Sequence, residues 1–410
     1  MKTFKSFITE AKNTHLEHAE DLVFNEGVNG ARNAINYLRS LRDMLAGNSQ
    51  QNKVVTVKWD GAPAVFAGID PTDGKFFVAK KGIFNKNPKV YKTPQDVDED
   101  TSGDLAYKMK IALEEFSKLG LKSGVIQGDI MFTHDTVKIS TINDEKYITF
   151  HPNTIVYAVP VKDPLAKRIV NAKIGVVWHT TYTGSSFETM SASFGKPIAK
   201  NLNRIPSVWM DDATYKDASG VATFNKQETA EITAILSQAG TLFNKINGRA
   251  LDYISKDEDF LILLKTYNNS KVRAGLEITD TQAHVTGLFH YIYDRFDKEI
   301  ESKKTDKGKQ AQIEKRDRIL AWFKIYDKSE LVKIYDLANL LVKAKHILVA
   351  KMDKAGSIST FLKTKNGFKV TSPEGYCAID HLTGNAVKLV NRMEFSMSNF
   401  STEYQKGWQK

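Results

Sequence analysis

The pattern of apolar and polar positions divides the chain into parts of different texture. Short apolar runs typical of strands dominate residues 1–224, whereas 225–353 carries long stretches with apolar residues at helical spacing. Strand-like runs return in 354–410, and these strands need a sheet to join. We therefore predict an α+β fold in which a helical insertion, 225–353, interrupts a sheet that both chain ends build.

Individual elements follow from the same pattern. In the first part it predicts helices over 31–45 and 109–119, each stopped by a glycine, and an exposed acidic loop over 94–103. The predicted strands there are 54–58, 76–79, 124–132, 147–150, 154–159 and 174–181. The predicted elements of the other two parts are helices 230–243, 260–267, 284–300, 313–325 and 330–352, and strands 367–370, 375–379 and 386–390.

Charged residues at strand ends are the first chemical signal. A β-branched run places Lys58 at the end of a predicted strand, and Asp60-Gly61 then turns the chain, so the amine extends from rigid backbone. Lys80-Lys81 follows the next strand in the same way. Asp129 interrupts a largely apolar strand, and a carboxylate there needs a partner or a purpose.

Charge, cysteine content and the lack of long apolar stretches indicate the type of partner and the cellular compartment. The formal charge of +10 suits a polyanionic partner such as nucleic acid. One cysteine, Cys377, excludes an internal disulfide and a cysteine-based zinc site, which favours a reducing cytoplasm. The sequence shows no apolar stretch of membrane-spanning length and no apolar signal core near its start, so we expect a cytoplasmic protein without membrane association.

Two other polar clusters have a plainer interpretation. Thr14 and Glu17 have the spacing of a helix capping box, so His15 and His18 would lie on a first turn. These histidines could hold a metal, but a solvated helix start is favoured because no third ligand is identifiable. The basic run 303–309 could track phosphates, although a solvated loop is the favoured interpretation.

Lys58-Trp59-Asp60-Gly61 has the form lysine, any residue, aspartate, glycine, and with the segments below it resembles the covalent nucleotidyltransferase superfamily. This superfamily contains ATP-dependent DNA ligases, RNA ligases and mRNA capping enzymes. Its first-motif lysine attacks the α-phosphate of a nucleotide and becomes a lysyl-nucleotide, and Lys58 matches it. Lys80-Lys81-Gly82 looks like the next motif, most similar to that of RNA ligases.

Later segments resemble the remaining motifs in family order. Gln127-Gly128-Asp129 is similar to the third motif, with aspartate in place of glutamate, and Tyr157 is either a purine-stacking aromatic or a core residue. Glu374-Gly375 looks like the fourth motif, although it lies much farther along the chain than is usual in the family. The alternative fourth motif, 174–178, lies at the usual distance but lacks the glutamate. The segment 386–392, with Lys388 and Arg392, looks like the fifth motif.

The resemblance implies a role for each matched position. It implies catalytic roles for Lys58, Lys81 and Lys388, and metal ligation by Asp129 and Glu374, whose oxygens suit Mg²⁺. Neighbouring cations would favour the neutral, nucleophilic form of the lysine. The positions that it implies for nucleotide binding are Asp60, Gly61, Lys80, Asp129, Tyr157, Glu374 and Arg392.

The resemblance also implies a fold and a function. The expected fold is a ligase-type, ATP-grasp-like nucleotidyltransferase core of antiparallel sheets flanked by helices. The expected function is ATP-dependent polynucleotide ligation with Mg²⁺, and the short segment after Arg392, with no oligonucleotide-binding barrel, favours an RNA-ligase-like enzyme over a DNA ligase. Two alternative functions are not excluded by the sequence. One is nucleotide transfer to another acceptor, as in capping or protein modification, and the other is a non-catalytic nucleic-acid-binding or virion-associated role on the same fold. The texture is also similar to that of uncharacterised proteins of large tailed bacteriophages.

Overall fold

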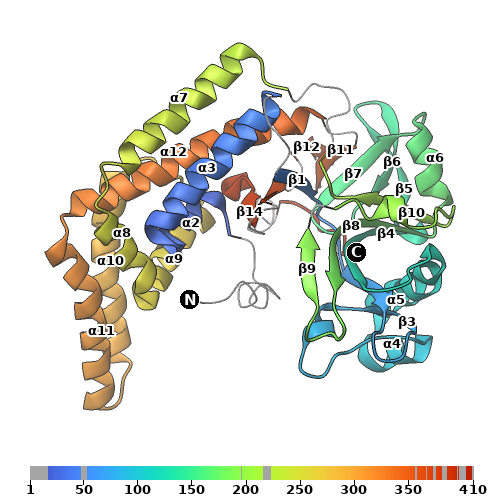
Figure 1. Cartoon of the computed structure of the whole chain (residues 1–410), viewed down its shortest axis with the longest axis horizontal. Coiled ribbons are helices and arrows are strands. Elements are labelled where there is room, and N and C mark those ends of the chain that lie inside the picture. The colour runs from blue at the N-terminus through green and yellow to red at the C-terminus, as the bar shows by residue number, and fades with distance from the viewer. Residues whose placement is uncertain are drawn as a thin grey trace.

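Helices and strands gather in two lobes, with a small sheet between them (Figure 1). Helices fill one lobe, at the left of Figure 1, and most strands form the other. The fold is therefore α+β, as predicted, with mainly antiparallel sheets. The computed structural model describes residues 17–47, 53–194, 196–215, 223–355, 358–365, 367–372, 375–380, 386–394, 396 and 403–408.

The helical lobe is larger than the predicted insertion. Leu38 of the N-terminal segment shares one buried core with Ile232, Leu263 and Leu341 of the insertion. The lobe thus takes in N-terminal helices that the predicted division at 225 assigns to the other part. Its elements are η2 (Ala19–Asp21), α2 (Leu22–Asn25), α3 (Gly27–Leu45), α7 (Lys226–Phe243), α8 (Gly248–Lys256), α9 (Glu258–Arg273), α10 (Thr281–Glu301), α11 (Asp306–Ile325), α12 (Lys328–Met352) and η7 (Asp353–Ala355).

Polar caps mark where helices α7 to α12 of this lobe begin. A side-chain oxygen of the residue before each of these six helices accepts a hydrogen bond from a first-turn N–H, which satisfies a donor that the helix itself leaves unpaired. The basic run 303–309 is exposed and crosses the start of α11. None of the described helices is both long and apolar enough to cross a membrane. The capping residues are Asn225, Asn247, Asp257, Asp280, Thr305 and Asp327.

A three-stranded sheet joins the two chain ends. Its order is β1 (Lys53–Lys58), β13 (Gly375–Asp380), β14 (Ala386–Leu389), with both pairs antiparallel. Val55, Tyr376 and Leu389 belong to the helical core, so one face of this sheet packs against the helices. The prediction that the C-terminal strands join an N-terminal strand is confirmed.

A second sheet forms the floor of the other lobe, in the order β10-β8-β4-β2-β3, with β9 paired to β8. The pair β10–β8 is parallel and the other pairs are antiparallel. Helices α4 (Pro94–Asp100) and α5 (Gly103–Phe116) share a core with one face of it. Its strands are β2 (Ala64–Ile69), β3 (Phe76–Ala79), β4 (Val125–Thr133), β8 (Ile174–Thr183), β9 (Ser191–Phe194) and β10 (Val208–Asp212).

A third sheet, in the order β12-β11-β7-β6-β5, packs against the second through a core that includes Met131, Val177, Phe150 and Val159. Its strands are β5 (Lys138–Ile142), β6 (Glu145–Phe150), β7 (Ile155–Pro160), β11 (Ser359–Thr364) and β12 (Gly367–Val370). The connecting helices are α6 (Pro164–Asn171), η3 (Lys81–Phe84), η4 (Ser117–Leu119), η5 (His134–Thr136) and η6 (Ala199–Asn201).

One local prediction differs from the structure. The predicted loop 94–103 contains α4, because Thr93 and Asp96 form a capping box and Pro94 occupies the first turn, where its missing N–H is harmless. The predicted helix start at Thr14 and the histidine His15 lie outside the described residues, and in the described part of the chain His18 directly precedes η2.

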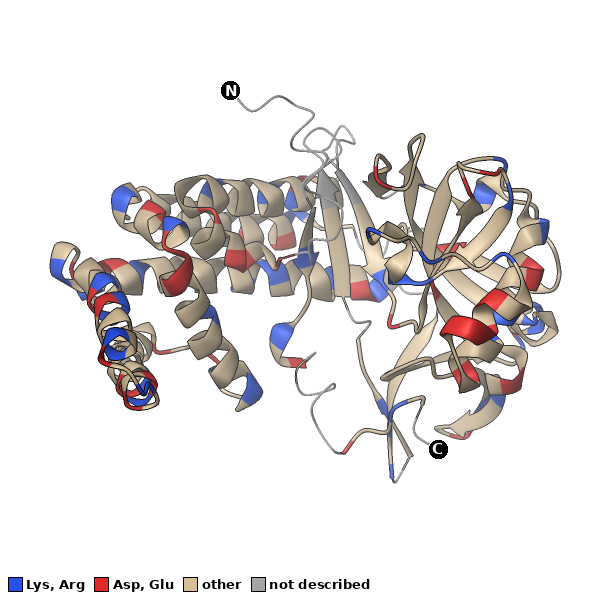
Figure 2. Cartoon of the chain, turned by 90° about the horizontal axis from the view of Figure 1, so that it is seen from below, with Lys and Arg blue, Asp and Glu red and all other residues tan. Residues whose placement is uncertain are grey.

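Both signs of charge occur on both lobes (Figure 2). The excess of positive charge is therefore not gathered in one lobe. Any preference for a polyanion must come from local groups of side chains rather than from the field of a whole lobe.

Candidate functional site

Strand β1 presents Lys58 at its C-terminal end and is hydrogen-bonded along both edges. On one edge Lys58 lies opposite Gly375 of β13. On the other edge, Val57 donates its N–H to the carbonyl of Ala213 at 2.6 Å, just beyond the end of β10. Because both edges are paired, the backbone from which the lysine extends is fixed.

The register of this sheet relates Lys58 to Lys388. Lys388 lies opposite Cys377, which in turn lies opposite Thr56. Side chains two apart on a strand, or directly opposite on neighbouring strands, share a face. By this register Lys58 and Lys388 share a face of the sheet with β13 between their strands, but Lys388 lines a cavity beside α9 of the helical lobe and is not among the charges that act on Asp129.

The carboxylate of Asp60 is buried and held by a loop of the third sheet. It accepts hydrogen bonds from Asn153 Nδ2 at 2.7 Å, from the N–H of Thr154 at 2.6 Å and from the N–H of Ile155 at 2.7 Å. Burial raises the pKa of Asp60, and these hydrogen bonds offset part of that rise. Two residues after Lys58, the chain is thus anchored by backbone amides.

The segment 403–408 packs against the loop that holds Asp60. Gly407 donates its N–H to the carbonyl of Asn153 at 2.6 Å, and Lys406 Nζ donates to Thr154 Oγ1 at 3.0 Å. The amide cradle of Asp60 therefore has the C-terminal segment directly behind it.

Tyr157 is a core residue. Its hydroxyl accepts a hydrogen bond from the N–H of Asp60 at 2.7 Å, and its ring stacks with those of Trp59 and Phe150. The residue is 2% exposed. A buried ring offers no surface to a base, so this arrangement favours the alternative of a core aromatic over the predicted purine-stacking role.

Asp129 lies on β4, opposite Ala64 of β2, and the chain passes very close to it at Gly61. A Cβ added at Gly61 would lie 2.5 Å from the Cβ of Asp129 and 2.9 Å from the sulfur of Met131. Only glycine allows this approach. The turn after Lys58 is therefore pressed against the strand that carries the carboxylate.

The charges that act on Asp129 identify its neighbours. Burial raises the pKa of this carboxyl, the charges of Lys58 and Lys81 lower it, the charge of Asp60 raises it, and the resulting pKa is about 7. Lys58, Asp60, Lys81 and Asp129 thus form one electrostatic group. These four of the predicted site residues are brought together from β1, the turn after it, η3 and β4.

His179 on β8 belongs to the same group and was not predicted. Its Nε2 lies 3.7 Å from Asp129 Oδ2, and its Nδ1 lies 2.7 Å from Thr180 Oγ1. Burial and the charge of Lys58 lower the pKa of His179 to about 4, so the imidazole is neutral near pH 7. The signal in the sequence was available: His179 is a polar residue directly after the apolar run 176–178 of a predicted strand, much as Asp129 is a carboxylate within a largely apolar strand.

The two lysines after β3 have different surroundings. Lys81 is exposed and acts on Asp129 through its charge. Lys80 instead places its Nζ 2.9 Å from Asp100 Oδ2, at the end of α4. The described contacts of Lys80 thus connect it to a helix rather than to Asp129, and its predicted nucleotide contact would require this ion pair to open.

Arg392 lies elsewhere. It pairs with Asp21 and lies 3.9 Å from Glu20, and together with Lys388 and His18 it lines a cavity of about 460 Å³ beside α9. None of its described partners belongs to the group around Asp129. The structure therefore does not bring the predicted nucleotide-binding Arg392 to Lys58.

The two candidates for the fourth motif differ in what can be described. Glu374, predicted to bind the nucleotide and the metal, lies outside the described residues, although its neighbour Gly375 lies opposite Lys58. The alternative segment 174–178 forms the start of β8 and contains no carboxylate. Strand β8 contributes His179 to the site instead.

The family of the chain is shown by its sequence. Residues 13–404 match a family described as "Family of unknown function (DUF6267)". The chain belongs to this family. No curated protein and no solved structure matches it. Because the function of the DUF6267 family is unknown, membership in it assigns no reaction or ligand to the site.

The DUF6267 site fits one mode of magnesium binding. Among the described residues, no group of three His, Cys, Asp or Glu side chains is arranged to hold a metal ion. Mg²⁺ at phosphoryl-transfer sites is commonly held by one or two carboxylates together with substrate phosphates. Asp129, whose side chain is 24% exposed, is available for that mode.

Proposed function

We propose that this protein is an ATP-dependent polynucleotide ligase, with RNA favoured over DNA, that acts through a lysyl-AMP intermediate at Lys58. The observation that carries the proposal is the electrostatic group of Lys58, Asp60, Lys81 and Asp129, assembled from separate segments. The antiparallel sheets, with helices inserted between the segments that resemble motifs, support a nucleotidyltransferase core of the ligase type as part of the same proposal.

Lys58 would act as the nucleophile of the first step. Its neutral amine attacks the α-phosphorus of ATP, a P–N bond forms, and the bond to the β-phosphate oxygen breaks to release pyrophosphate. Asp129, with a pKa of about 7, is suited to accept the proton that the amine gives up. Lys81 stabilises negative charge on the transferring phosphate.

The AMP would then pass to nucleic acid. An oxygen of a 5′-phosphate attacks the phosphorus of AMP and Lys58 leaves, which gives a 5′–5′ pyrophosphate linkage. A 3′-hydroxyl attacks the 5′-phosphate and AMP leaves, which closes the strand. After Asp129 has passed its proton to solvent, the ionised carboxylate and substrate phosphates would hold Mg²⁺, which would neutralise phosphate charge.

Labelling with ATP tests the first step. Protein incubated with α-labelled ATP and Mg²⁺ should acquire an acid-labile covalent label, and Lys58→Ala should abolish it. Lys86→Ala removes an exposed lysine nearby and should label normally. A protein that never acquires a Lys58-dependent label is not a nucleotidyltransferase of this type.

A chase identifies the acceptor. Pre-labelled protein is given 5′-phosphorylated single-stranded RNA or nicked duplex DNA, and the label should move to the 5′-phosphate and then appear as free AMP when the strand is sealed. Transfer to the RNA at a higher rate supports RNA ligation. Label that leaves only toward a protein or another acceptor contradicts ligation while preserving the lysyl-nucleotide.

A further inference from the structure

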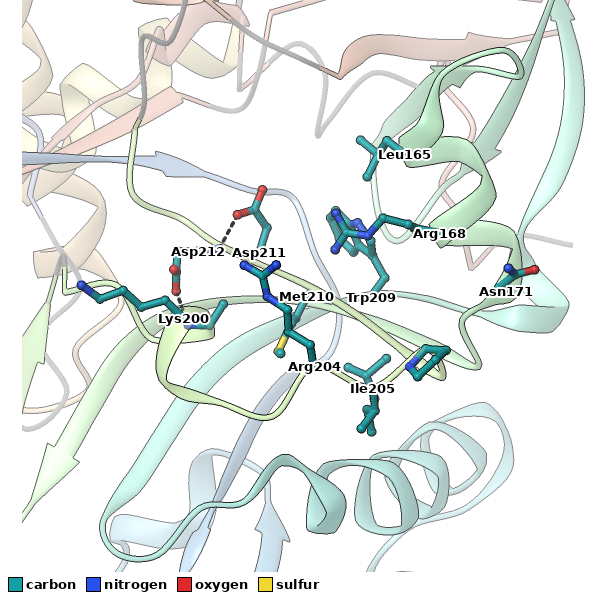
Figure 3. A pocket seen from close by; sticks show the side chains of 13 residues that line it. Leu165, Arg168, Asn171, Lys200, Arg204, Ile205, Trp209, Met210, Asp211 and Asp212 are labelled. Carbon is teal, nitrogen blue, oxygen red and sulfur yellow. Dashed lines mark hydrogen bonds between the residues drawn. The ribbon is translucent and has the colours of Figure 1, made fainter.

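A concave site separate from the group around Asp129 lies at the open edge of the second sheet. Strand β10 is the terminal strand of that sheet, and a pocket of about 500 Å³ runs along it between α6 and the segment 199–206 (Figure 3). Trp209, 2% exposed, is the aromatic residue of its lining. The floor of the pocket, formed by β10, is therefore part of the protein core. The side chains of its two walls, α6 and the segment 199–206, determine which ligand it can bind.

The walls carry three cations. Arg168 extends from α6, while Arg204 and Lys200 come from the facing segment (Figure 3). All three residues are exposed, and within the described part of the chain the structure gives none of them an ion pair or a side-chain hydrogen bond. Positive charge drawn from both walls of a concave site attracts an anion.

Two carboxylates also line the pocket, and both have backbone partners. Asp212 accepts hydrogen bonds from the N–H groups of Ile198 and Ala199 at 2.7 and 2.8 Å, so it fixes the turn before η6. Asp211 accepts from the N–H of Asp212 at 2.8 Å. These acids lower the positive potential of the floor but leave the guanidinium groups of the two walls available.

We propose that this pocket binds a backbone phosphate of the polynucleotide substrate, and this proposal rests on the proposed ligase function. Arginine offers a planar fork of N–H donors that matches phosphate oxygens, and Arg168 and Arg204 could grip one phosphate from opposite sides. Because the lining aromatic is buried, the pocket contacts the strand through phosphate and not through base stacking.

The pocket is connected to the nucleophile through backbone. Strand β10, which forms its floor, continues directly to Ala213, whose carbonyl accepts the N–H of Val57. Lys58 is the next residue. A phosphate held beside β10 would position a strand on a rigid element that is hydrogen-bonded to the one carrying Lys58.

Salt-dependent binding tests the pocket. We would measure binding of a fluorescent 5′-phosphorylated single-stranded RNA by anisotropy at several salt concentrations, for the wild type and for Arg168→Gln/Arg204→Gln. The variant should bind about ten- to a hundredfold more weakly. Its slope of log affinity against log salt should be shallower by about 0.7, the value for one lost phosphate contact on a single strand.

The matched control is Lys162→Gln/Lys167→Gln, which removes the same charge from exposed positions in and just before α6 that do not line the pocket. It should keep the wild-type affinity and slope. Equal losses in the control and pocket variants would mean that only net charge matters, and this overturns the proposal. Unchanged RNA binding by the pocket variant overturns it as well, and so does polyglutamate that competes as well as RNA.

Lysyl-AMP formation without nucleic acid separates this proposal from the proposed function. The pocket variant should label at Lys58 like the wild type, because the pocket lies outside the group around Asp129. If the wild type never labels but the pocket variant alone loses RNA binding, the ligase function fails and the phosphate pocket stands. If both proteins label and bind RNA equally, the pocket proposal fails alone.

Discussion

Asp129 combines two properties that suit the proton acceptor of the proposed reaction. It is buried enough for its pKa to rise to about 7, and it lies within the influence of two lysines and a second carboxylate. A carboxyl with this pKa can change protonation state near neutral pH, where an exposed aspartate stays ionised.

This environment predicts a pH-dependent stability. Since the native pKa of Asp129 is raised from 3.8 to about 7, the native state binds the extra proton between these values, and this group destabilises the fold as pH rises through that window. Asp129→Asn removes the effect. Relative to wild type, the variant should gain up to about 4 kcal/mol between about pH 4 and pH 8, measured by urea unfolding. Parallel stability curves for the two proteins would show that the carboxyl is ionised throughout.

At the residue scale, the sequence drew attention to positions where a polar side chain broke an apolar pattern, and the structure brings several of them together. Asp129 was identified in this way, and its neighbours Lys58 and Lys81 were identified from their places at strand ends. Tyr157 was not resolved, because an aromatic in an apolar strand fits both a core and a ligand surface, and only its contacts with Trp59 and Asp60 decide between them.

At the scale of elements, the segment 403–408 buttresses the loop that holds Asp60. Gly407 lies so close to this loop that an added Cβ would be 1.9 Å from the carbonyl oxygen of His151. Backbone cannot yield as a flexible side chain can. The position therefore requires glycine for contact rather than for an unusual backbone angle.

We expect Gly407→Ala to displace this segment and loosen the cradle of Asp60. The substitution should lower the free energy of unfolding by about 1–3 kcal/mol, as overpacking does. It should also speed hydrogen exchange at the amides of Thr154 and Ile155, which donate to Asp60. Gly82→Ala is the matched control, because its added Cβ meets nothing nearer than 3.6 Å. Unchanged exchange at both amides in Gly407→Ala would show that the segment does not support the cradle.

Most long periodic elements were predicted from sequence, whereas the short amphipathic helices α6 and α8 and elements set by local chemistry or pairing were not. Strands 54–58 and 375–379 have β-branched or aromatic residues and match β1 and β13. Helix α4 was missed because its acidic composition suggested a loop, although Thr93 and Asp96 carry the capping signal. Strand β10 was missed because its residues form a strand through parallel pairing with β8, and a sequence pattern does not show which strands pair.

At the scale of the whole molecule, a buried ion pair connects the N-terminal segment to the last long helix of the insertion. Lys345 Nζ of α12 lies 2.7 Å from Glu20 Oε1, with side-chain exposures of 1% and 8%. Burial alone would raise the pKa of Glu20, but the charges of Lys345, His18 and Arg392 outweigh it and lower the pKa to about 2. The pair therefore remains ionised inside the helical lobe.

Lys345→Met should destabilise the protein by about 3–5 kcal/mol, because it leaves the carboxylate of Glu20 buried without its main partner. Glu20→Gln/Lys345→Met removes both charges and should recover part of that loss. Urea unfolding of the wild type and the two variants measures both effects. A single variant as stable as the double variant would contradict the role of this pair.

The pairing of β1 with β13 also has a consequence for the order in which the protein is made. During translation, Lys58 and its strand leave the ribosome more than three hundred residues before the strand that covers their edge. The helical insertion can fold in this interval, since most of its contacts are within itself and with α3. Strand β1 stays unpaired on that edge until residues 375–380 are synthesised, so any nascent chain that ends earlier lacks the pairing that fixes the backbone at Lys58.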